Sequence, residues 1–144
     1  MKRQFKLCII AFLCIFLVAC EEDQKKKLAK AADDIAIAVD AGIKIKRECA
    51  KQGWIDQKQE FFVTKALYDI NSAGEMFSAH VKKINQMDTG SKTELIQLMR
   101  DINASVAKLN DEILSIKNPE AQAKLKTITF MLGTSMTIVQ SLVE

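Results

Sequence analysis

The sequence has few of the residues that interrupt helices and few that build catalytic centres. One proline and five glycines are spread over 144 residues, so few positions favour turns. It has one histidine, no glycine-rich phosphate loop and no metal-ligand spacing. The first scarcity favours an all-helical chain, and the second argues against an enzyme and against a metal site.

The first 19 residues have the parts of an export signal. Lys2, Arg3 and Lys6 supply positive charge, and an uninterrupted apolar run over residues 7–19 follows them. This run is well short of the roughly 20 residues that cross a membrane as a helix. The segment is therefore expected to direct export and then to be removed.

The stretch Leu17-Val18-Ala19-Cys20 closes the apolar run and matches, position by position, an aliphatic-small-small-Cys lipobox. On these residues the chain resembles the bacterial lipoproteins. The resemblance implies that a signal peptidase cuts between Ala19 and Cys20, and that Cys20 carries a diacylglyceryl thioether and an N-acyl chain such as palmitate. It also implies a protein anchored by lipid to a membrane of the cell envelope, on the extracytoplasmic side. An uncleaved anchor or an ordinary secreted chain is the alternative.

Removal of the signal changes the charge balance. The full chain carries 21 basic and 18 acidic residues, and Lys2, Arg3 and Lys6 leave with the signal, so 18 of each sign remain. A nucleic-acid-binding protein needs surplus positive charge to displace counterions. A nucleic-acid partner is therefore not expected.

The cysteines permit no disulfide within the mature chain. Cys8 and Cys14 leave with the signal, Cys20 is expected to be lipidated, and only Cys49 remains. Cys49 lies on an apolar stripe at helical spacing and is expected to be a small core residue. A free thiol that pairs with another chain is the alternative. No cofactor is expected apart from the covalent lipid.

The whole sequence therefore divides into three predicted parts. These are a signal peptide over 1–19, a short extended lipidated tether over 20–27 and a helical domain over 28–144. Apolar residues recur at spacings of three and four, as in coiled coils, over 25–51, over 57–87, after Ser91 and after Pro119. Turns of two to five residues between four such helices favour an antiparallel, up-down-up-down four-helix bundle. A three-helix body with the first helix partly acting as a stalk is the alternative.

Helix boundaries are predicted from turn and capping residues. Gly53 suits the left-handed position after a helix, which places Trp54 over Cys49 as a cover on the bundle end. A binding anchor is the alternative for Trp54. The predicted N-terminal caps are Asp56 with Gln59, Ser91 with Glu94, and Asn118 followed by Pro119.

The only histidine, His80, falls on the apolar seam of the second helix. Ferritin-like metal bundles need a Glu three residues before such a His, and here that residue is Phe77. His80 is therefore expected to be a hydrogen-bonded residue at the edge of the core.

The last helix has one unusual face. No charged residue occurs from Thr127 to Val143, and at 100° per residue the large apolar side chains fill one arc. The opposite arc is polar but uncharged, with an aromatic residue in its middle. It is a candidate interface with a protein partner or a second copy, and a modestly polar surface is the alternative. Its residues are Phe130, Thr129, Gly133, Thr134, Thr137, Gln140 and Ser141.

Two functions are compatible with these residues. The first is a membrane-anchored helical lipoprotein that serves as a protein-interaction module of the envelope and has no catalytic activity. The second is a helical lipoprotein that binds a small ligand in a pocket between helices, near Gly42, Ala73 and Gly74. A cavity of several hundred Å³ lined by Phe77, Met87 or Met99 is what the second function requires.

Overall fold

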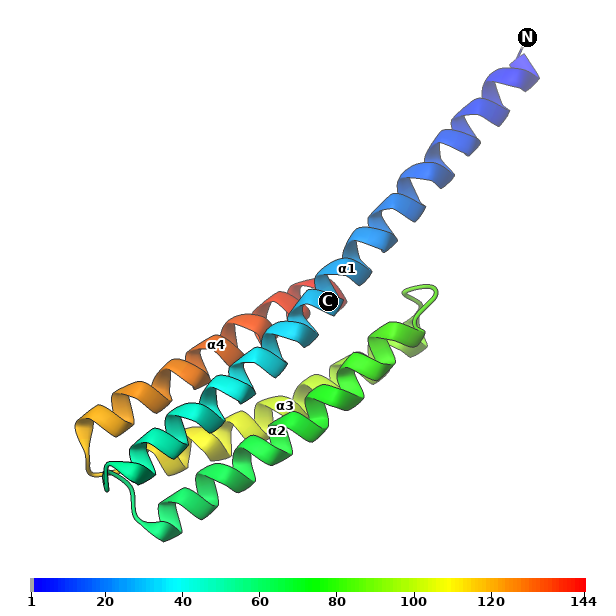
Figure 1. Cartoon of the computed structure of the whole chain (residues 1–144). Helices are drawn as coiled ribbons and strands as arrows, with labels where there is room; N and C mark the ends of the chain where they lie inside the picture. Colours follow the sequence, from blue (N-terminus) through cyan, green and yellow to red (C-terminus); the bar gives the residue numbers. More distant parts are fainter. Residues whose placement is uncertain (1) are drawn as a thin grey trace.

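Four helices make up the computed structural model, which describes the backbone of residues 2–144 and the side chains of residues 22–144. They are α1 (Lys2–Lys51), α2 (Gln57–Lys83), α3 (Thr89–Leu114) and α4 (Pro119–Val143). Figure 1 shows that the last half of α1 lies alongside α2, α3 and α4, whereas its first half extends beyond them. The predicted all-α four-helix bundle is confirmed, and the three-helix alternative is wrong.

The helices alternate in direction. Lys46 near the end of α1 donates a hydrogen bond to Glu60 near the start of α2, and Lys25 donates one to the carbonyl of Ile84 just after α2. Glu48 near the end of α1 is likewise paired with Lys124 near the start of α4. Each helix packs against two others, in the cyclic order α1, α2, α3, α4.

The apolar seams meet in one core. Large aliphatic side chains and Phe77 are almost fully buried, and each such side chain stabilises the fold by about 1.5–3 kcal/mol through removal of apolar surface from water. The seam residues Ile45, Val106 and Leu142 are only half-buried, because a straight helix drifts from a seam repeat of 3.5 residues. The buried seam residues are Leu28, Ala31, Ile35, Ala38, Gly42 and Cys49; Val63, Ala66, Ile70, Ala73, Phe77 and Ile84; Leu95, Met99, Ile102, Leu109, Ile113 and Ile116; and Ala121, Leu125, Ile128, Leu132, Ser135 and Val139.

The first turn forms as predicted. Gly53 has φ +68°, and its N–H and that of Trp54 bond to the carbonyls of Ala50 and Cys49 at 3.0 and 2.9 Å. These are the two hydrogen bonds of a Schellman motif. Trp54 is half-buried and packs against the core. The predicted cover over this end of the bundle is confirmed.

Two of the three predicted N-terminal caps are confirmed. Asp56 and Gln59 bond reciprocally at 2.8 and 3.0 Å, forming a capping box. Asn118 accepts the N–H of Ala121 at 3.0 Å, next to a proline in the first helical turn. Both caps satisfy backbone donors that have no partner within their helix.

The second connection differs from the prediction. Helix α2 ends at Lys83 and not near Met87, and Asp88, not Ser91, caps α3 by accepting the Ser91 N–H at 2.7 Å. Ile84 leaves the helix with an extended backbone, and its carbonyl accepts a hydrogen bond from Lys25 Nζ at 2.6 Å. A contact from α1 thus fixes the end of α2.

The predicted tether is helical and not extended. Residues 22–27 continue α1 without a break. Two exposed ion pairs reinforce them, Glu22–Lys26 and Asp23–Lys27, each between residues one helical turn apart. Leu28 is the first fully buried residue, at the predicted start of the domain. The lipobox side chains, including Cys20 and the cleavage position Ala19, lie outside the described ones. Among the helical stretches of residues 22–144, none combines the length and the apolar character that a membrane span requires.

Candidate interface on the fourth helix

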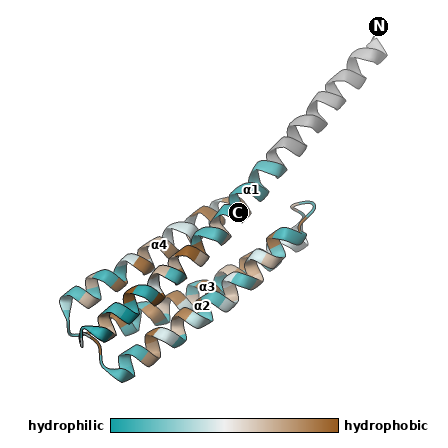
Figure 2. Cartoon of the chain, in the orientation of Figure 1, coloured by the Kyte–Doolittle hydropathy of each residue, from teal (hydrophilic) through white to brown (hydrophobic). Residues whose placement is uncertain are grey.

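One side of α4 is fixed in the core and the other is therefore left outside. Ile128, Leu132 and Val139 are fully buried, in contact with the rest of the core. Because a helix has 3.6 residues per turn, residues two positions along from these point away from the bundle. Figure 2 shows the hydropathy of α4 beside that of the other helices.

The structure places six of the seven predicted interface residues on the exposed side of α4. Phe130 is 77% exposed, the highest fraction among the exposed large apolar side chains of residues 22–144. Thr129 is half-buried and lies at the edge of this side. We call the exposed set, with Thr129 at its edge, the α4 face: Thr129, Phe130, Gly133, Thr134, Thr137, Gln140 and Ser141.

The hydroxyl groups of the α4 face are turned back onto their own helix. Thr134 Oγ1 donates to the carbonyl of Phe130 at 3.0 Å and Thr137 Oγ1 to that of Gly133 at 2.9 Å. Thr129 and Ser141 make the same kind of bond, at 3.0 and 2.8 Å. Each hydroxyl has one proton to donate, so these donors are already used. The face consequently presents methyl groups and an aromatic ring more than polar donors.

Further exposed apolar side chains extend the α4 face toward α1. Met131 and Ile138 of α4 are exposed. The Glu48–Lys124 pair sets the antiparallel register, which brings Ile37 of α1 close to the level of Thr134. Ile37 is 58% exposed. No pattern in the sequence indicated Ile37, because it is a single isoleucine off the seam, and Asp33 and Asp40, one turn away on either side, are charged.

Three glycines differ in the space around them. A Cβ on Gly42 would lie 2.8 Å from Leu67 Cδ2, and one on Gly74 would lie 3.1 Å from Ile35 Cγ2. Both glycines therefore allow close packing of helices within the core. A Cβ on Gly133 would meet no atom within 4 Å. Packing within one chain thus explains Gly42 and Gly74 but not Gly133.

A second group of exposed apolar residues lies on α2. Phe61, Tyr68 and Met76 are all more than half exposed, and exposed lysines such as Lys58 and Lys65 lie on the same helix. None of these three residues belongs to the predicted interface. The sequence did contain an indication of this group, because Phe61 and Tyr68 are seven residues apart, on one side of the helix, and off the seam. The charged neighbours make this surface less continuous than the α4 face.

His80 is a residue at the edge of the core, as predicted. Its Nδ1 lies 2.8 Å from Glu94 Oε2, which links the end of α2 to the start of α3. Its Nε2 is buried and has no hydrogen-bond partner. A surface hollow of about 480 Å³ lies beside it, lined by polar residues that include Lys83, Asp88 and Ser91.

Cys49 is a free, fully buried thiol, as predicted. Burial raises the pKa of this thiol, and the charge of the adjacent Glu48 adds to the effect. Both effects keep the group protonated and unreactive at neutral pH.

The residues of the predicted ligand pocket are packed together. Gly42, Ala73, Gly74 and Phe77 are buried, and a small hollow of about 120 Å³ beside Gly74 lies between α1 and α2. Neither this hollow nor the larger one beside His80 is lined by Phe77, Met87 or Met99.

The comparisons add no relative. No family model, curated protein or solved structure matches the chain. Over residues 22–144, no three His, Cys, Asp or Glu side chains lie close enough together to hold a metal ion. The α4 face is thus the surface that the described side chains favour most as a functional site.

Proposed function

We propose that this protein is a lipid-anchored lipoprotein of the bacterial envelope, whose helical body binds another protein through the α4 face and performs no catalysis. The observation that carries the proposal is the α4 face itself. It is uncharged, its hydroxyl donors are used within the helix, and an exposed aromatic ring lies in its middle. Aromatic residues are enriched at protein interfaces, and charged residues are depleted from their centres.

The other three helices expose charge instead. Asp40, Lys44 and Arg47 on α1 are exposed, as are Arg100 and Lys108 on α3 and the lysines of α2. Bringing such groups into an interface requires desolvation and a matched partner charge. The α4 face requires neither, which favours it as the site of association.

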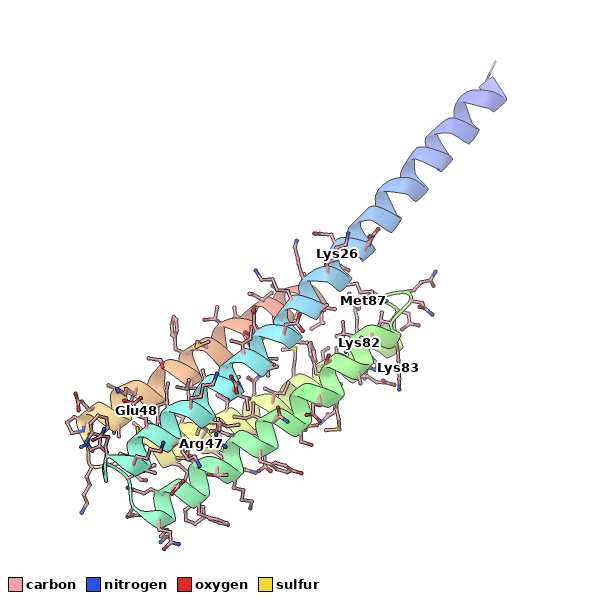
Figure 3. All side chains as sticks on the ribbon, in the orientation of Figure 1. Lys26, Arg47, Glu48, Lys82, Lys83 and Met87 are labelled. Atoms are coloured by element: carbon pink, nitrogen blue, oxygen red, sulfur yellow. The ribbon has the colours of Figure 1, made fainter. Side chains whose placement is uncertain are left out.

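The proposed anchor defines which end of the bundle faces the membrane. From Cys20 to Leu28 the helix rises by about 12 Å. The connection that contains Met87 lies at the same end of the bundle as Lys26, whereas Arg47 and Glu48 lie at the other (Figure 3). Helix α4 would therefore run toward the membrane, with its face directed sideways.

The first experiment tests the anchor. The full chain and its Cys20→Ser variant are expressed in a bacterium, and the mature N-terminus is analysed by mass spectrometry after separation of membranes. We expect an acylated N-terminal Cys20 in the wild type and an uncleaved, unacylated precursor in the variant. A Cys14→Ser variant should behave like the wild type. A mature wild-type protein without acyl groups would contradict the anchor.

The second experiment tests the surface. A photo-crosslinking amino acid is placed at Gln140, at the side of the α4 face, in the full chain and in its Phe130→Glu and Thr137→Glu variants. We expect a defined protein adduct with the otherwise unchanged chain and no adduct with the Phe130→Glu and Thr137→Glu variants. The helical circular dichroism of all three proteins should be the same. Ala104→Glu, on the exposed side of α3, is the matched control and should keep the adduct. Absence of any adduct would contradict the interaction function.

A further inference from the structure

We infer that the protein bound by the α4 face is a second copy of the same chain, packed with its α4 parallel to the first about a two-fold axis. The inference rests on the proposed function for the membrane anchor. It names the partner, which the proposed function leaves open.

Charge favours a second copy at this surface. A two-fold axis brings each residue near it against the same residue of the other copy, so any charge there meets a like charge. From Thr127 to Val143 helix α4 carries no charge. The exposed sides of α1, α2 and α3 all carry charge along their lengths. The α4 face is thus the helix face on which identical chains meet without repulsion.

Gly133 supplies an independent argument. A glycine inside a helix is less stable than an alanine, because it loses more backbone freedom on folding. The two core glycines have a neighbouring side chain that an added Cβ would contact, and Gly133 has none. Close approach of a backbone from outside the chain explains why a residue without a side chain occupies this position. A second α4 that crosses the first at Gly133 makes such an approach.

The side chains around Gly133 fit a crossing of two identical helices. Thr129, Gly133, Thr137 and Ser141 are four residues apart and form one row of small residues. Phe130 projects beside this row. Rows spaced by four residues interdigitate when two helices cross at about −50°. In that packing Phe130 of each copy lies over the small residues of the other.

The anchor selects the parallel arrangement and compensates for a small contact. Two chains held in one membrane by the same end are related by an axis along the membrane normal, so their α4 helices run in the same direction. A contact over residues 127–143 is about 25 Å long and buries on the order of 800 Å² in total. That area is below the roughly 1,200 Å² of stable interfaces in solution. Confinement in one membrane raises the effective concentration and makes the weak contact sufficient.

The test adds one cysteine at a time to the membrane-bound protein, expressed from the full chain. Residues near a two-fold axis form a disulfide with themselves, because a disulfide needs Cα atoms within about 7 Å. Thr137→Cys reports on the α4 face, and Ser72→Cys on α2 and Ala104→Cys on α3 are matched exposed controls. The wild-type chain serves as the blank, because it carries the same four native cysteines as each variant, and of these Cys49 is buried. Membranes are treated with copper phenanthroline and analysed on non-reducing gels.

We expect the yield of covalent dimer from Thr137→Cys to exceed that of both controls about tenfold, because only its Cα atoms come within disulfide range. Adding Gly133→Ala to Thr137→Cys should lower the yield severalfold, while the unfolding midpoint of the chain rises. A purely structural role of Gly133 cannot produce these two opposite changes. Equal yields at all three positions, or a yield that Gly133→Ala leaves unchanged, would overturn the inference.

Failure of this inference is distinguishable from failure of the proposed function. If the Gln140 photo-adduct contains a different protein and Thr137→Cys gives no dimer, the interaction function stands and the second copy is wrong as the partner. If Thr137→Cys gives a dimer but Cys20 carries no lipid, the membrane anchor is wrong and the contact between copies stands.

Discussion

The two glycines Gly42 and Gly133 provide a matched test of how the helices pack. Each lies inside a long helix, so replacement by alanine adds the same methyl group and the same helix propensity. That propensity is worth about 1 kcal/mol in favour of alanine. At Gly133 the added Cβ meets no atom within 4 Å. We therefore expect Gly133→Ala to raise the free energy of unfolding of the monomer by about 1 kcal/mol.

At Gly42 the added Cβ would lie 2.8 and 3.3 Å from the two Cδ atoms of Leu67, and 3.4 Å from Ile128 Cγ2. Leu67 is only 1% exposed, so its movement displaces other core atoms. Overpacking of this kind costs about 1–3 kcal/mol, which outweighs or cancels the gain in propensity. We expect Gly42→Ala to be less stable than Gly133→Ala by about 1–3 kcal/mol.

The assay is urea unfolding of the mature domain, followed by circular dichroism at a low protein concentration where it is monomeric. A difference of 1 kcal/mol corresponds to about 4 °C in the thermal midpoint for a domain of this size. Combining Gly42→Ala with Leu67→Ala supplies the control, since removal of the Leu67 side chain should make the alanine at position 42 favourable. An equal gain in stability from both alanines would refute the reasoning, because it would mean that α1 does not approach Leu67 as closely as described.

Three further predictions follow from the helix ends and ion pairs. Glu60→Ala removes the partner of the mostly buried Lys46 and should cost about 1–3 kcal/mol, whereas loss of Asp40 from its exposed pair with Lys44 should cost less than about 0.5 kcal/mol; urea unfolding measures both. Gly53→Ala forces a side chain into φ +68° and should cost about 1 kcal/mol, with Gly53→Asn less harmful. Hydrogen bonds from the backbone N–H and the side chain of Ser91 lower the pKa of Asp88, so its stabilising effect is complete above the unfolded pKa of about 3.9 and is lost as pH falls through the lower folded value. The loss of stability in Asp88→Ala should therefore be smaller at pH 2 than at pH 7, and Asp88→Asn should keep the cap at both. An equal loss for Asp88→Ala at the two pH values would contradict the capping role of the ionised Asp88 side chain.

Local sequence was sufficient to predict most of the fold. The apolar spacing identified the buried side of each helix, and the caps at Asp56 and Asn118 depend on residues no more than three positions away. The end of α2 could not be predicted in this way. Ile84 leaves the helix with its carbonyl bound to Lys25, which is 59 residues distant in sequence. Pattern within a single helix does not reveal such a contact.

The candidate site was predictable in outline but not in chemistry. The absence of charge from Thr127 to Val143 identified the α4 face, and helical geometry predicted that Phe130 would be exposed. The sequence did not show that the threonine hydroxyls turn inward, because an exposed threonine can bond to water equally well. The sequence placed Gly42 between helices and Gly133 on the outer face of the last helix, but it did not show how closely other atoms approach each glycine.

The helical rather than extended form of residues 22–27 has a consequence for reach. An extended segment of these six residues would span at most about 22 Å and would allow a folded body to sample many positions. A helix holds the body at one separation from its anchor, and the 25 residues of α4 then cover a fixed interval of about 38 Å beyond it. Under the proposed anchoring, the protein is a spacer of constant length. A partner in the same membrane can dock only if its own binding surface lies at the same distance from the lipid headgroups. A second copy of the chain meets that condition because its anchor and its helix are identical.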